Sequence, residues 1–240
     1  MAKKLRIDKI LSNIGYGSRA EIKKYCKQGM ISVNGKNINN PGIQVDPEND
    51  KILFNGEEVN YREFVYIMLN KPDGYISATF DKHDPIVLDL IDSSYYVFEP
   101  FPVGRLDKDT EGLLVLTNDG QLAHRVLSPK KHVPKTYYAK IEGIVTKEDV
   151  VAFSKGVTLD DGYETMPSQL KILKSDEISE IELTIHEGKF HQVKRMFESV
   201  GKKVVYLKRL SMGKLELDKN LELGVYRELT EDEIKLLEER

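Results

Sequence analysis

The sequence predicts an α+β protein in two parts: a small module of a helix pair and a hairpin, then a larger domain with a mixed, largely antiparallel sheet and flanking helices. Within residues 1–60, apolar residues repeat first with helical and then with alternating spacing. The polar segment 57–63 has no clear periodicity and is the expected linker. Beyond it, strand candidates outnumber helices without alternating strictly with them, which argues against a doubly wound parallel sheet. The predicted domains are residues 1–60 and 61–240.

The elements of the first module follow from local signals. An apolar stripe over residues 5–14 predicts a short helix. Ser18 and Glu21 have the spacing of a capping box, so a second helix should begin at Ser18. Residues 31–36 alternate apolar and polar side chains and contain Asn-Gly, which predicts a hairpin. A further short strand is expected at residues 51–54.

The larger domain contains both element types. Its strand candidates are residues 64–70, 112–117, 135–141, 178–185 and 203–211. Its helix candidates are residues 120–128, 147–155, 190–200 and 230–239. The last helix should begin with a second capping box, formed by Thr230 and Glu233.

Charge is distributed unevenly, although the net charge is only -3. Residues 1–36 contain nine Lys and Arg against two acids, and residues 189–214 contain eight against one. Two basic segments favour a positive face that binds a polyanion, rather than scattered surface lysines. In the second predicted helix, Arg19, Lys23 and Lys27 have the spacing i, i+4, i+8, so they share one face and can follow a phosphate backbone.

Other compositional features exclude several classes of protein. The single cysteine, Cys26, rules out a disulfide framework and favours a reducing compartment. No apolar run reaches the roughly 18 residues of a membrane span, and the first residues do not resemble a signal peptide. We therefore expect a cytoplasmic protein without membrane contact. Neither a metal nor another cofactor is expected, because no metal-binding spacing occurs among the histidines His83, His124, His132, His186 and His191.

The most informative segment is Gly104–Gly112, which runs directly into the apolar strand candidate 113–116. Arg105 stands two positions before Asp107, so a cation and a carboxylate are expected side by side at a sheet edge. A carboxylate enclosed with a ligand has its pKa raised by burial, and a neighbouring cation opposes this shift. Asp107 is therefore a candidate nucleophile. The ordinary alternative is an aspartate that caps the loop before a strand.

Two later segments carry further candidates. Tyr137, in Lys135-Thr136-Tyr137, offers a ring that can stack on a base, a contact worth roughly 1–3 kcal/mol; a strand tyrosine is more often part of a core. Residues 187–197 form a strand-to-helix junction with clustered cations. Lys194 and Arg195 are both candidates to pair with the carboxylate. Adjacent helical residues point about 100° apart, so only one of them should reach it.

These segments together resemble the pseudouridine synthases of the RsuA/RluB type. Residues 1–60, with Arg6-Ile7-Asp8-Lys9, Gly17-Ser18-Arg19 and Val33-Asn34-Gly35-Lys36, resemble the S-four-like RNA-binding domain. The resemblance implies that Asp107 is the nucleophile, that Tyr137 stacks on the target base, and that Lys194 or Arg195 pairs with Asp107. The residues that it implies for RNA or substrate contact are Arg6, Lys9, Arg19, Lys23, Lys27, Lys36, Arg105, Lys135, His191 and Gln192.

The implied reaction isomerises a uridine of ribosomal RNA to pseudouridine. The base is detached from ribose, turned and rejoined through carbon-5, without a metal or redox cofactor. Residues 204–213 and 224–230 are most similar to the branch that acts on 16S ribosomal RNA. The expected substrate is a small-subunit assembly intermediate with ribosomal proteins, and a monomer is the default expectation for the enzyme. The alternatives are a 23S enzyme of the same family, a non-catalytic RNA-binding assembly factor, and an RNA N-glycosidase that would release free uracil.

Overall fold

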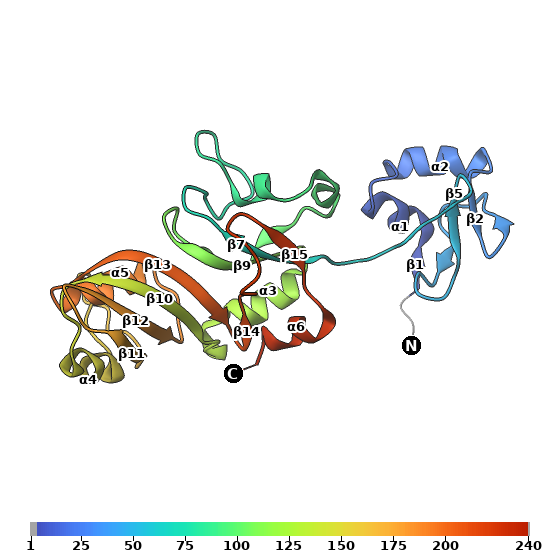
Figure 1. Cartoon of the computed structure of the whole chain (residues 1–240). Coiled ribbons are helices and arrows are strands. Elements are labelled where there is room, and N and C mark those ends of the chain that lie inside the picture. The colour runs from blue at the N-terminus through green and yellow to red at the C-terminus, as the bar shows by residue number, and fades with distance from the viewer. Residues whose placement is uncertain (1–3, 240) are drawn as a thin grey trace. The chain divides into compact units, whose positions relative to one another are not determined.

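The computed structural model describes residues 4–239, and its chain forms two compact units (Figure 1). The first unit takes the described residues up to Val65 together with Ser93–Glu99, so it extends beyond the predicted boundary at residue 60. The second takes Tyr66–Asp92 and the described residues from Pro100 onward. Lys3, one of the basic residues counted above, lies outside the described residues.

The first unit combines two helices with short strands around one apolar core. The helices are α1 (Ile7–Asn13) and α2 (Arg19–Lys27). The strands are β1 (Leu5–Arg6), β2 (Ile31–Val33), β3 (Lys36–Asn37), β4 (Gln44–Val45), β5 (Ile52–Phe54) and β6 (Glu57–Glu58). The core includes Ile10 and Leu11 of α1, Ile22 and Cys26 of α2, and Ile31 of β2. Each helix therefore turns one apolar stripe inward.

Local signals located most of these elements. The capping box is present, since the Glu21 amide donates to Ser18 Oγ at 3.3 Å and the Ser18 amide donates to Glu21 at 2.8 Å. The predicted hairpin is confirmed as β2 and β3, which pair antiparallel. The linker prediction was wrong at its start, because residues 57–58 form β6 and pair with β5. Those two glutamates are exposed, so their polarity marked an edge strand rather than a linker.

The second unit is built on one sheet. Its main strands are β7 (Tyr66–Lys71), β9 (Glu111–Thr117), β10 (Lys135–Glu142), β11 (Gln169–Lys174), β12 (Ile178–Ile185), β13 (Lys203–Met212) and β15 (Tyr226–Glu228). Two shorter strands, β8 (Phe101–Pro102) and β14 (Leu215–Glu216), complete the nine strands formed by the described residues. The order is β11-β12-β10-β13-β9-β7-β15. Only the β9–β13 pair is parallel among these neighbours, which confirms a mixed, largely antiparallel sheet.

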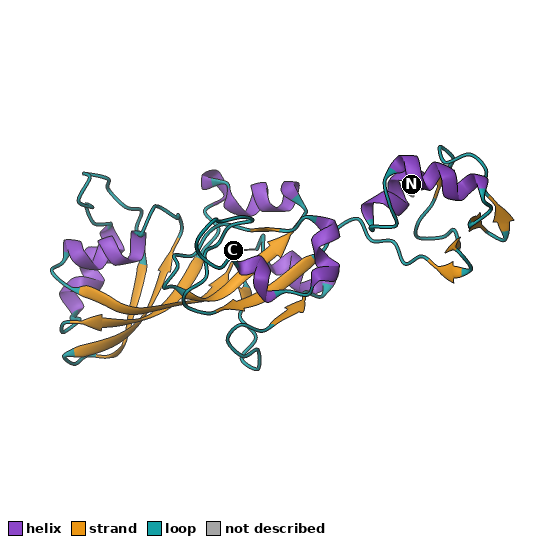
Figure 2. Cartoon of the chain, turned by 90° about the horizontal axis from the view of Figure 1, so that it is seen from above, coloured by secondary structure: helices purple, strands orange, loops and turns teal. Residues whose placement is uncertain are grey.

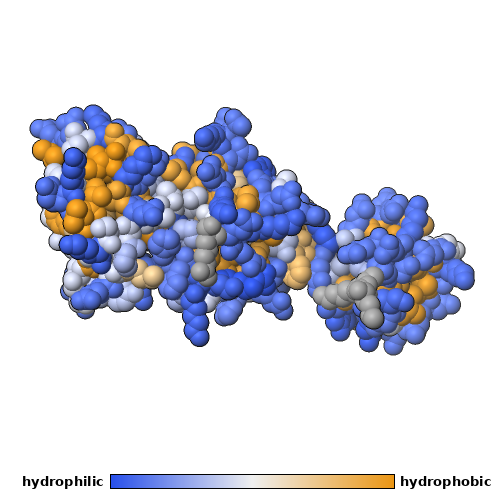
Figure 3. Space-filling model, turned by 90° about the horizontal axis from the view of Figure 1, so that it is seen from below, coloured by the Kyte–Doolittle hydropathy of each residue, from blue (hydrophilic) through white to orange (hydrophobic). Residues whose placement is uncertain are grey.

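Helices cover parts of this sheet (Figure 2). They are α3 (Gly120–Leu127), α4 (Lys147–Lys155), α5 (Gln192–Ser199) and α6 (Glu231–Leu236). Leu122 and Val126 of α3 share a core cluster with Met68, Val115 and Met212 of the sheet. At the end of the unit that carries α4, β11 and β12, apolar surface is visible (Figure 3), in accord with the exposed side chains of Val151, Leu173 and Ile178 in these elements.

The start of α5 differs from the prediction. A helix was expected from residue 190, but α5 begins at Gln192 because His191 has a left-handed backbone, with φ of +49°. Non-glycine residues adopt this conformation rarely, and they tend to do so at functional sites. The turn separates His191 and the residues before it from the helix, so that they face the loop that precedes β9.

The Gly104–Gly112 motif ends in a glycine because β9 has no room for a side chain at position 112. Its φ is +100°, and a Cβ there would lie 2.3 Å from the Arg209 carbonyl oxygen. The close approach comes from the parallel pairing of β9 with β13, in which Gly112 stands opposite Arg209. A side chain would separate these strands, so glycine is required for their pairing.

Candidate active site

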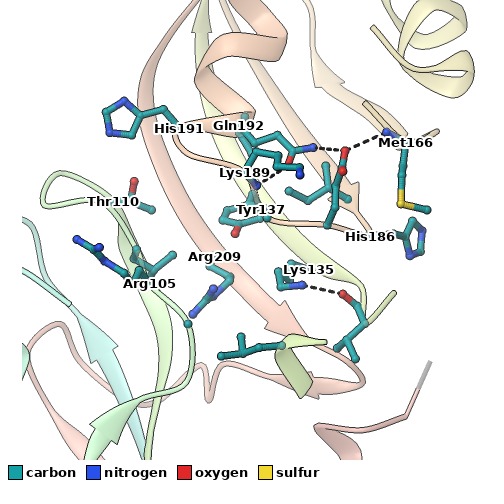
Figure 4. Close-up of a pocket in the computed structure, with 18 of the residues that line it drawn as sticks. Arg105, Thr110, Lys135, Tyr137, Met166, His186, Lys189, His191, Gln192 and Arg209 are labelled. Carbon is teal, nitrogen blue, oxygen red and sulfur yellow. Dashed lines mark hydrogen bonds between the residues drawn. The ribbon is translucent and has the colours of Figure 1, made fainter. Parts of the chain in front are cut away.

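A cavity of about 400 Å³ lies in the second unit, where the Gly104–Thr110 loop meets β10, β13 and the segment before α5 (Figure 4). Its lining includes Asp107, Tyr137 and Lys194, which the sequence motifs predict as catalytic residues. Arg195 is the one catalytic candidate that does not line it. The sheet thus gathers residues from three segments that are far apart in the chain.

Hydrogen bonds from Ser77 fix the backbone of the loop that carries Asp107. Ser77 is buried, and its hydroxyl donates to the Leu106 carbonyl at 2.9 Å while accepting from the Leu106 amide at 3.0 Å. The Thr110 amide donates to the Asp107 carbonyl at 3.1 Å, which closes a turn. The Asp107 side chain is 27% exposed. The carboxylate is therefore fixed at its backbone and remains open toward the cavity.

Lys194, and not Arg195, lies beside Asp107. The Lys194 Nζ is 3.3 Å from Asp107 Oδ2 and 2.6 Å from Asp109 Oδ1. Arg195 points elsewhere and pairs with Asp160 and, at 2.7 Å, with Asp161. Burial acts to lower the pKa of Lys194, but the hydrogen bond to Asp109 and the charge of Asp107 outweigh it and raise that pKa. Lys194 therefore stays cationic at neutral pH.

His191 approaches the same carboxylate from the other side. Its Nε2 is 3.5 Å from Asp107 Oδ1, and its ring stacks on Phe190 with the centroids 3.7 Å apart. Phe190 is 76% exposed beside the cavity, a feature that sequence reasoning missed. The only signal for it was a large apolar residue inside a basic segment. An exposed aromatic pair at a cavity mouth is suited to stacking on bases.

Gln192 lines the cavity, but its side-chain amide is already hydrogen-bonded within the protein. It is buried, its Nε2 donates to Glu187 Oε1 at 2.7 Å, and its Oε1 accepts from the Lys189 amide at 2.8 Å. Both ends of the amide are thus used inside the protein. Glu187 also accepts from the Tyr163 hydroxyl at 2.6 Å. Gln192 holds the turn before α5 in place, and it contributes to the site through that turn.

Tyr137 and Lys135 lie on the wall of the cavity. They stand two residues apart on β10, so their side chains share one face of the sheet. Tyr137 is 7% exposed and lines the cavity. The Lys135 ammonium donates to the Val133 carbonyl at 2.9 Å. Burial, together with the charge of Arg209, lowers the pKa of Lys135 to about 8.

A buried lysine that the sequence did not single out anchors the catalytic loop. Lys71 is fully buried at the end of β7. Its ammonium donates to the carbonyls of Pro72, Lys108 and Thr110 at 2.9–3.0 Å. Three protons meet three acceptors, and two of these, the carbonyls of Lys108 and Thr110, tie the loop of Asp107 to β7.

We expect Lys71→Met to lower activity and to reduce the free energy of unfolding by about 2 kcal/mol, because buried carbonyls lose their donors. Burial lowers the pKa of Lys71 to about 8, despite the nearby acids, from an ordinary value of 10.5. The unfolded chain therefore binds more protons between these values, and the stability of wild type relative to the variant should rise as pH increases from 8 to 10.5. Urea unfolding at pH 7 and pH 10 tests this. Equal activity and an equal pH response in both proteins would contradict it.

The remaining basic residues predicted to contact RNA differ in whether they form ion pairs within residues 4–239. Arg105 is exposed, lines the cavity and makes no ion pair with any residue of 4–239. In the first unit, Arg6 is already committed to Asp8, with 2.6 Å between Nη2 and Oδ2, and Lys9 is half-buried. The exposed cations of this unit's candidate set that form no ion pair within the described part of the chain are Arg19, Lys23 and Lys27 on α2 and Lys36 on β3.

The described part of the chain gives two further results. Residues 4–239 contain no group of three or more His, Cys, Asp or Glu side chains placed to hold a metal ion. No helix among these residues has the length and apolar character that crossing a bilayer requires.

Comparison with known proteins assigns both units. Residues 65–199 match the family of RNA pseudouridylate synthases, and residues 5–52 match the S4 domain. A crystal structure of a pseudouridylate synthase superposes with a TM-score of 0.68 and 37% identity over 97% of this chain and 99% of that one. The fold is thus that of an enzyme class that modifies RNA.

The relatives extend this assignment to nearly the full length. The Bacillus subtilis uncharacterized RNA pseudouridine synthase YtzG is 52% identical over 98% of this chain and 99% of its own. The ribosomal large subunit pseudouridine synthase B of Bacillus subtilis is 41% identical over 97% and 95%. The ribosomal small subunit pseudouridine synthase A of Escherichia coli is 38% identical over 96% and 98%. The chain belongs to the RNA pseudouridine synthases of the RsuA/RluB type, as its motifs predicted, and carries an N-terminal S4 domain.

Proposed function

We propose that this pseudouridine synthase isomerises a specific uridine of 16S ribosomal RNA, with Asp107 as the nucleophile. The observation that carries the proposal is the position of Asp107 in the cavity, 3.3 Å from the Lys194 ammonium. An ammonium at this distance attracts the carboxylate and orients it within the cavity, as a nucleophile requires. A carboxylate that only capped the loop would not need this cation.

The proposed reaction begins when the RNA binds and the target uridine leaves its stack, which costs a few kcal/mol in base-flipping enzymes generally. Arg105 is exposed at the cavity and free to hold the RNA backbone. Asp107 then attacks the sugar or the base. Tyr137 stacks on the uracil while it turns, and a base removes the carbon-5 proton after the carbon–carbon bond has formed.

RNA binding by the S4 domain is proposed to use the exposed face of α2. Changing Arg19, Lys23 and Lys27 together to Gln should weaken binding about tenfold at low salt. The slope of log K against log salt should fall by roughly two to three, since three phosphate contacts are lost. Filter binding at several salt concentrations measures both quantities. The matched control replaces three exposed lysines that already pair with acids, Lys171, Lys174 and Lys235. Equal losses in both triple variants would contradict a specific role for α2.

The choice of ribosomal subunit is part of the proposal. The 16S target follows from the similarity of residues 204–213 and 224–230 to the small-subunit branch. The 41% identity to a large-subunit synthase favours 23S RNA as the second candidate. We further propose that the enzyme acts as a monomer on an assembly intermediate, in which ribosomal proteins have ordered the RNA around the uridine.

The test is tritium release from carbon-5-labelled uridine in 16S transcripts, 23S transcripts and partly assembled small subunits. Release from 16S RNA or from the small-subunit particles alone supports the proposed target. Release from 23S RNA alone overturns the target and keeps the enzyme class. Tight binding without release from any substrate favours the assembly-factor alternative, and free uracil in the medium favours an N-glycosidase.

A further inference from the structure

Arg209 is a buried cation whose donors are only partly used. It lies on β13 with 2% of its surface exposed, and it lines the cavity. Its Nε donates to the Leu113 carbonyl at 2.8 Å. Its Nη2 is buried and has no hydrogen-bond partner among residues 4–239. An unpaired charged donor in a protein interior is strongly unfavourable, so this nitrogen requires an acceptor that a bound ligand can supply.

The sheet register places Arg209 next to the proposed base-stacking residue. Arg209 stands directly opposite Tyr137 on β10, so the two side chains are neighbours on one face. Lys135 precedes Tyr137 by two residues and shares that face. Figure 4 shows both cations close to the Tyr137 ring. One wall of the cavity therefore presents an aromatic ring and two cations.

Two more side chains near this wall of the cavity have hydrogen-bond donors without acceptors in the part of the chain that the structure describes. Among residues 4–239, the Lys135 ammonium has one acceptor, the Val133 carbonyl, for its three protons. The Thr110 hydroxyl is buried, lines the cavity and has no partner in the described chain. These groups surround the space next to Asp107. A ligand that satisfies them must be flat enough to lie on Tyr137 and must carry acceptor oxygens on its edge.

Uracil has this shape and gains negative charge in the reaction. If Asp107 attacks ribose, the electron pair of the C1′–N1 bond leaves with the base and spreads over N1, O2 and O4. If Asp107 adds to carbon-6, the electrons of the C5–C6 double bond move toward carbon-5 and O4. Either route places charge on uracil oxygens, and cations already aimed at those oxygens lower the barrier. A backbone phosphate fits this wall of the cavity less well, because it stays joined to the RNA on both sides. The exposed Arg105 is better placed to bind a phosphate at the surface.

We propose that Arg209, with Lys135 beside it, binds a carbonyl oxygen of the target uracil and stabilises the negative charge that the base acquires when it is detached. This inference rests on the proposed use of the cavity as the uridine site. It makes Arg209 a catalytic residue in addition to Asp107 and Tyr137. The pKa of Lys135 is lowered first by burial and then by the charge of Arg209, and an anion between the two cations would relieve both effects.

The experiment uses a short synthetic RNA that contains the mapped target uridine, prepared with uridine, 2-thiouridine or 4-thiouridine at that position. Sulfur accepts hydrogen bonds less well than oxygen, so one thio substitution should slow wild type about tenfold. In Arg209→Met we expect kcat to fall by roughly 10²–10³-fold, with KM changed by less than fivefold. We also expect that thio substitution to have little additional effect in the variant, because the contact is already lost. Steady-state kinetics give kcat and KM, and single-turnover rates measured by nucleoside chromatography give the thio effects.

The outcomes separate the proposals from each other. An Arg209→Met enzyme with the wild-type rate, or with full thio effects at both oxygens, overturns the role of Arg209. If Arg209→Met does not fold, Lys135→Met decides, because Lys135 makes only one hydrogen bond and its loss should leave circular dichroism unchanged. A slower Lys135→Met enzyme with a reduced thio effect supports the proposal, and an unchanged one overturns it. If wild type forms no pseudouridine in any RNA, the proposed function itself fails.

Discussion

Asp107→Asn should fold, bind RNA with the wild-type affinity and lose on the order of 10⁴-fold or more in rate. The amide cannot act as the nucleophile. The variant should remain folded because Lys194 keeps its second partner, Asp109, at 2.6 Å, so no buried ammonium is left unpaired. Tritium release measures the rate, while filter binding and circular dichroism report on binding and fold.

Asp109→Asn is the matched control for this prediction. Asp109 also pairs with Lys194, but its side chain is 64% exposed and it does not line the cavity. We expect a loss of about tenfold or less, because Asp109 orients Lys194 without touching the substrate. Formation of pseudouridine by Asp107→Asn at the wild-type rate would remove Asp107 from the mechanism.

Lys194→Gln and Arg195→Gln should differ strongly, although the residues are adjacent. Removing the cation beside Asp107 should cost roughly 10²–10³-fold in kcat, since the carboxylate loses the charged partner that orients it. Arg195 pairs with exposed acids, so its loss should change both the rate and the stability of the fold only slightly. Steady-state kinetics of both variants decide between the two residues. A larger loss in Arg195→Gln would reverse the assignment.

The pH dependence of activity and of stability gives a second test of Lys194, through its ion pair with Asp109. The pKa of Lys194 is raised above its ordinary 10.5, so wild type should not lose activity through this group below that pH. Burial acts to raise the pKa of Asp109, but its hydrogen bond to Lys194 outweighs this and lowers it below 3.8. The stability that the Lys194–Asp109 pair contributes is thus present above pH 3.8. It is lost as the pH falls through the lower pKa of the folded state. Lys194→Gln should abolish this acid dependence.

Secondary-structure elements that depend on neighbouring residues alone could be predicted well from the sequence. Apolar periodicity and the capping boxes at Ser18 and Thr230 located the helices, and Asn34-Gly35 located the hairpin. The strand β11 was missed because both its ends are polar and mostly exposed, which hides the alternation. The segment 57–58 was misread for the same reason. Edge strands carry a weaker pattern than central ones, since water covers much of their surface.

The candidate site was predictable where a residue lies within a motif. Asp107, Tyr137 and Lys194 were found in this way, and the structure brings all three to one cavity. The choice between Lys194 and Arg195 required the start of α5, which depends on the left-handed His191. Lys71 and Arg209 could not be found, because their importance comes from pairing across the sheet. Nothing in the neighbouring sequence distinguishes a buried cation from an exposed one.

The position of β13 in the sheet also has a consequence during translation. This strand is the last long one to be synthesised, yet it lies between β10 and β9. Until residues 203–212 leave the ribosome, the two earlier strands have no partner on these sides, and the loop of Asp107 borders an open edge. Arg209 is also missing until then. A growing chain therefore lacks a complete site until β13 has been synthesised and has paired with both β9 and β10.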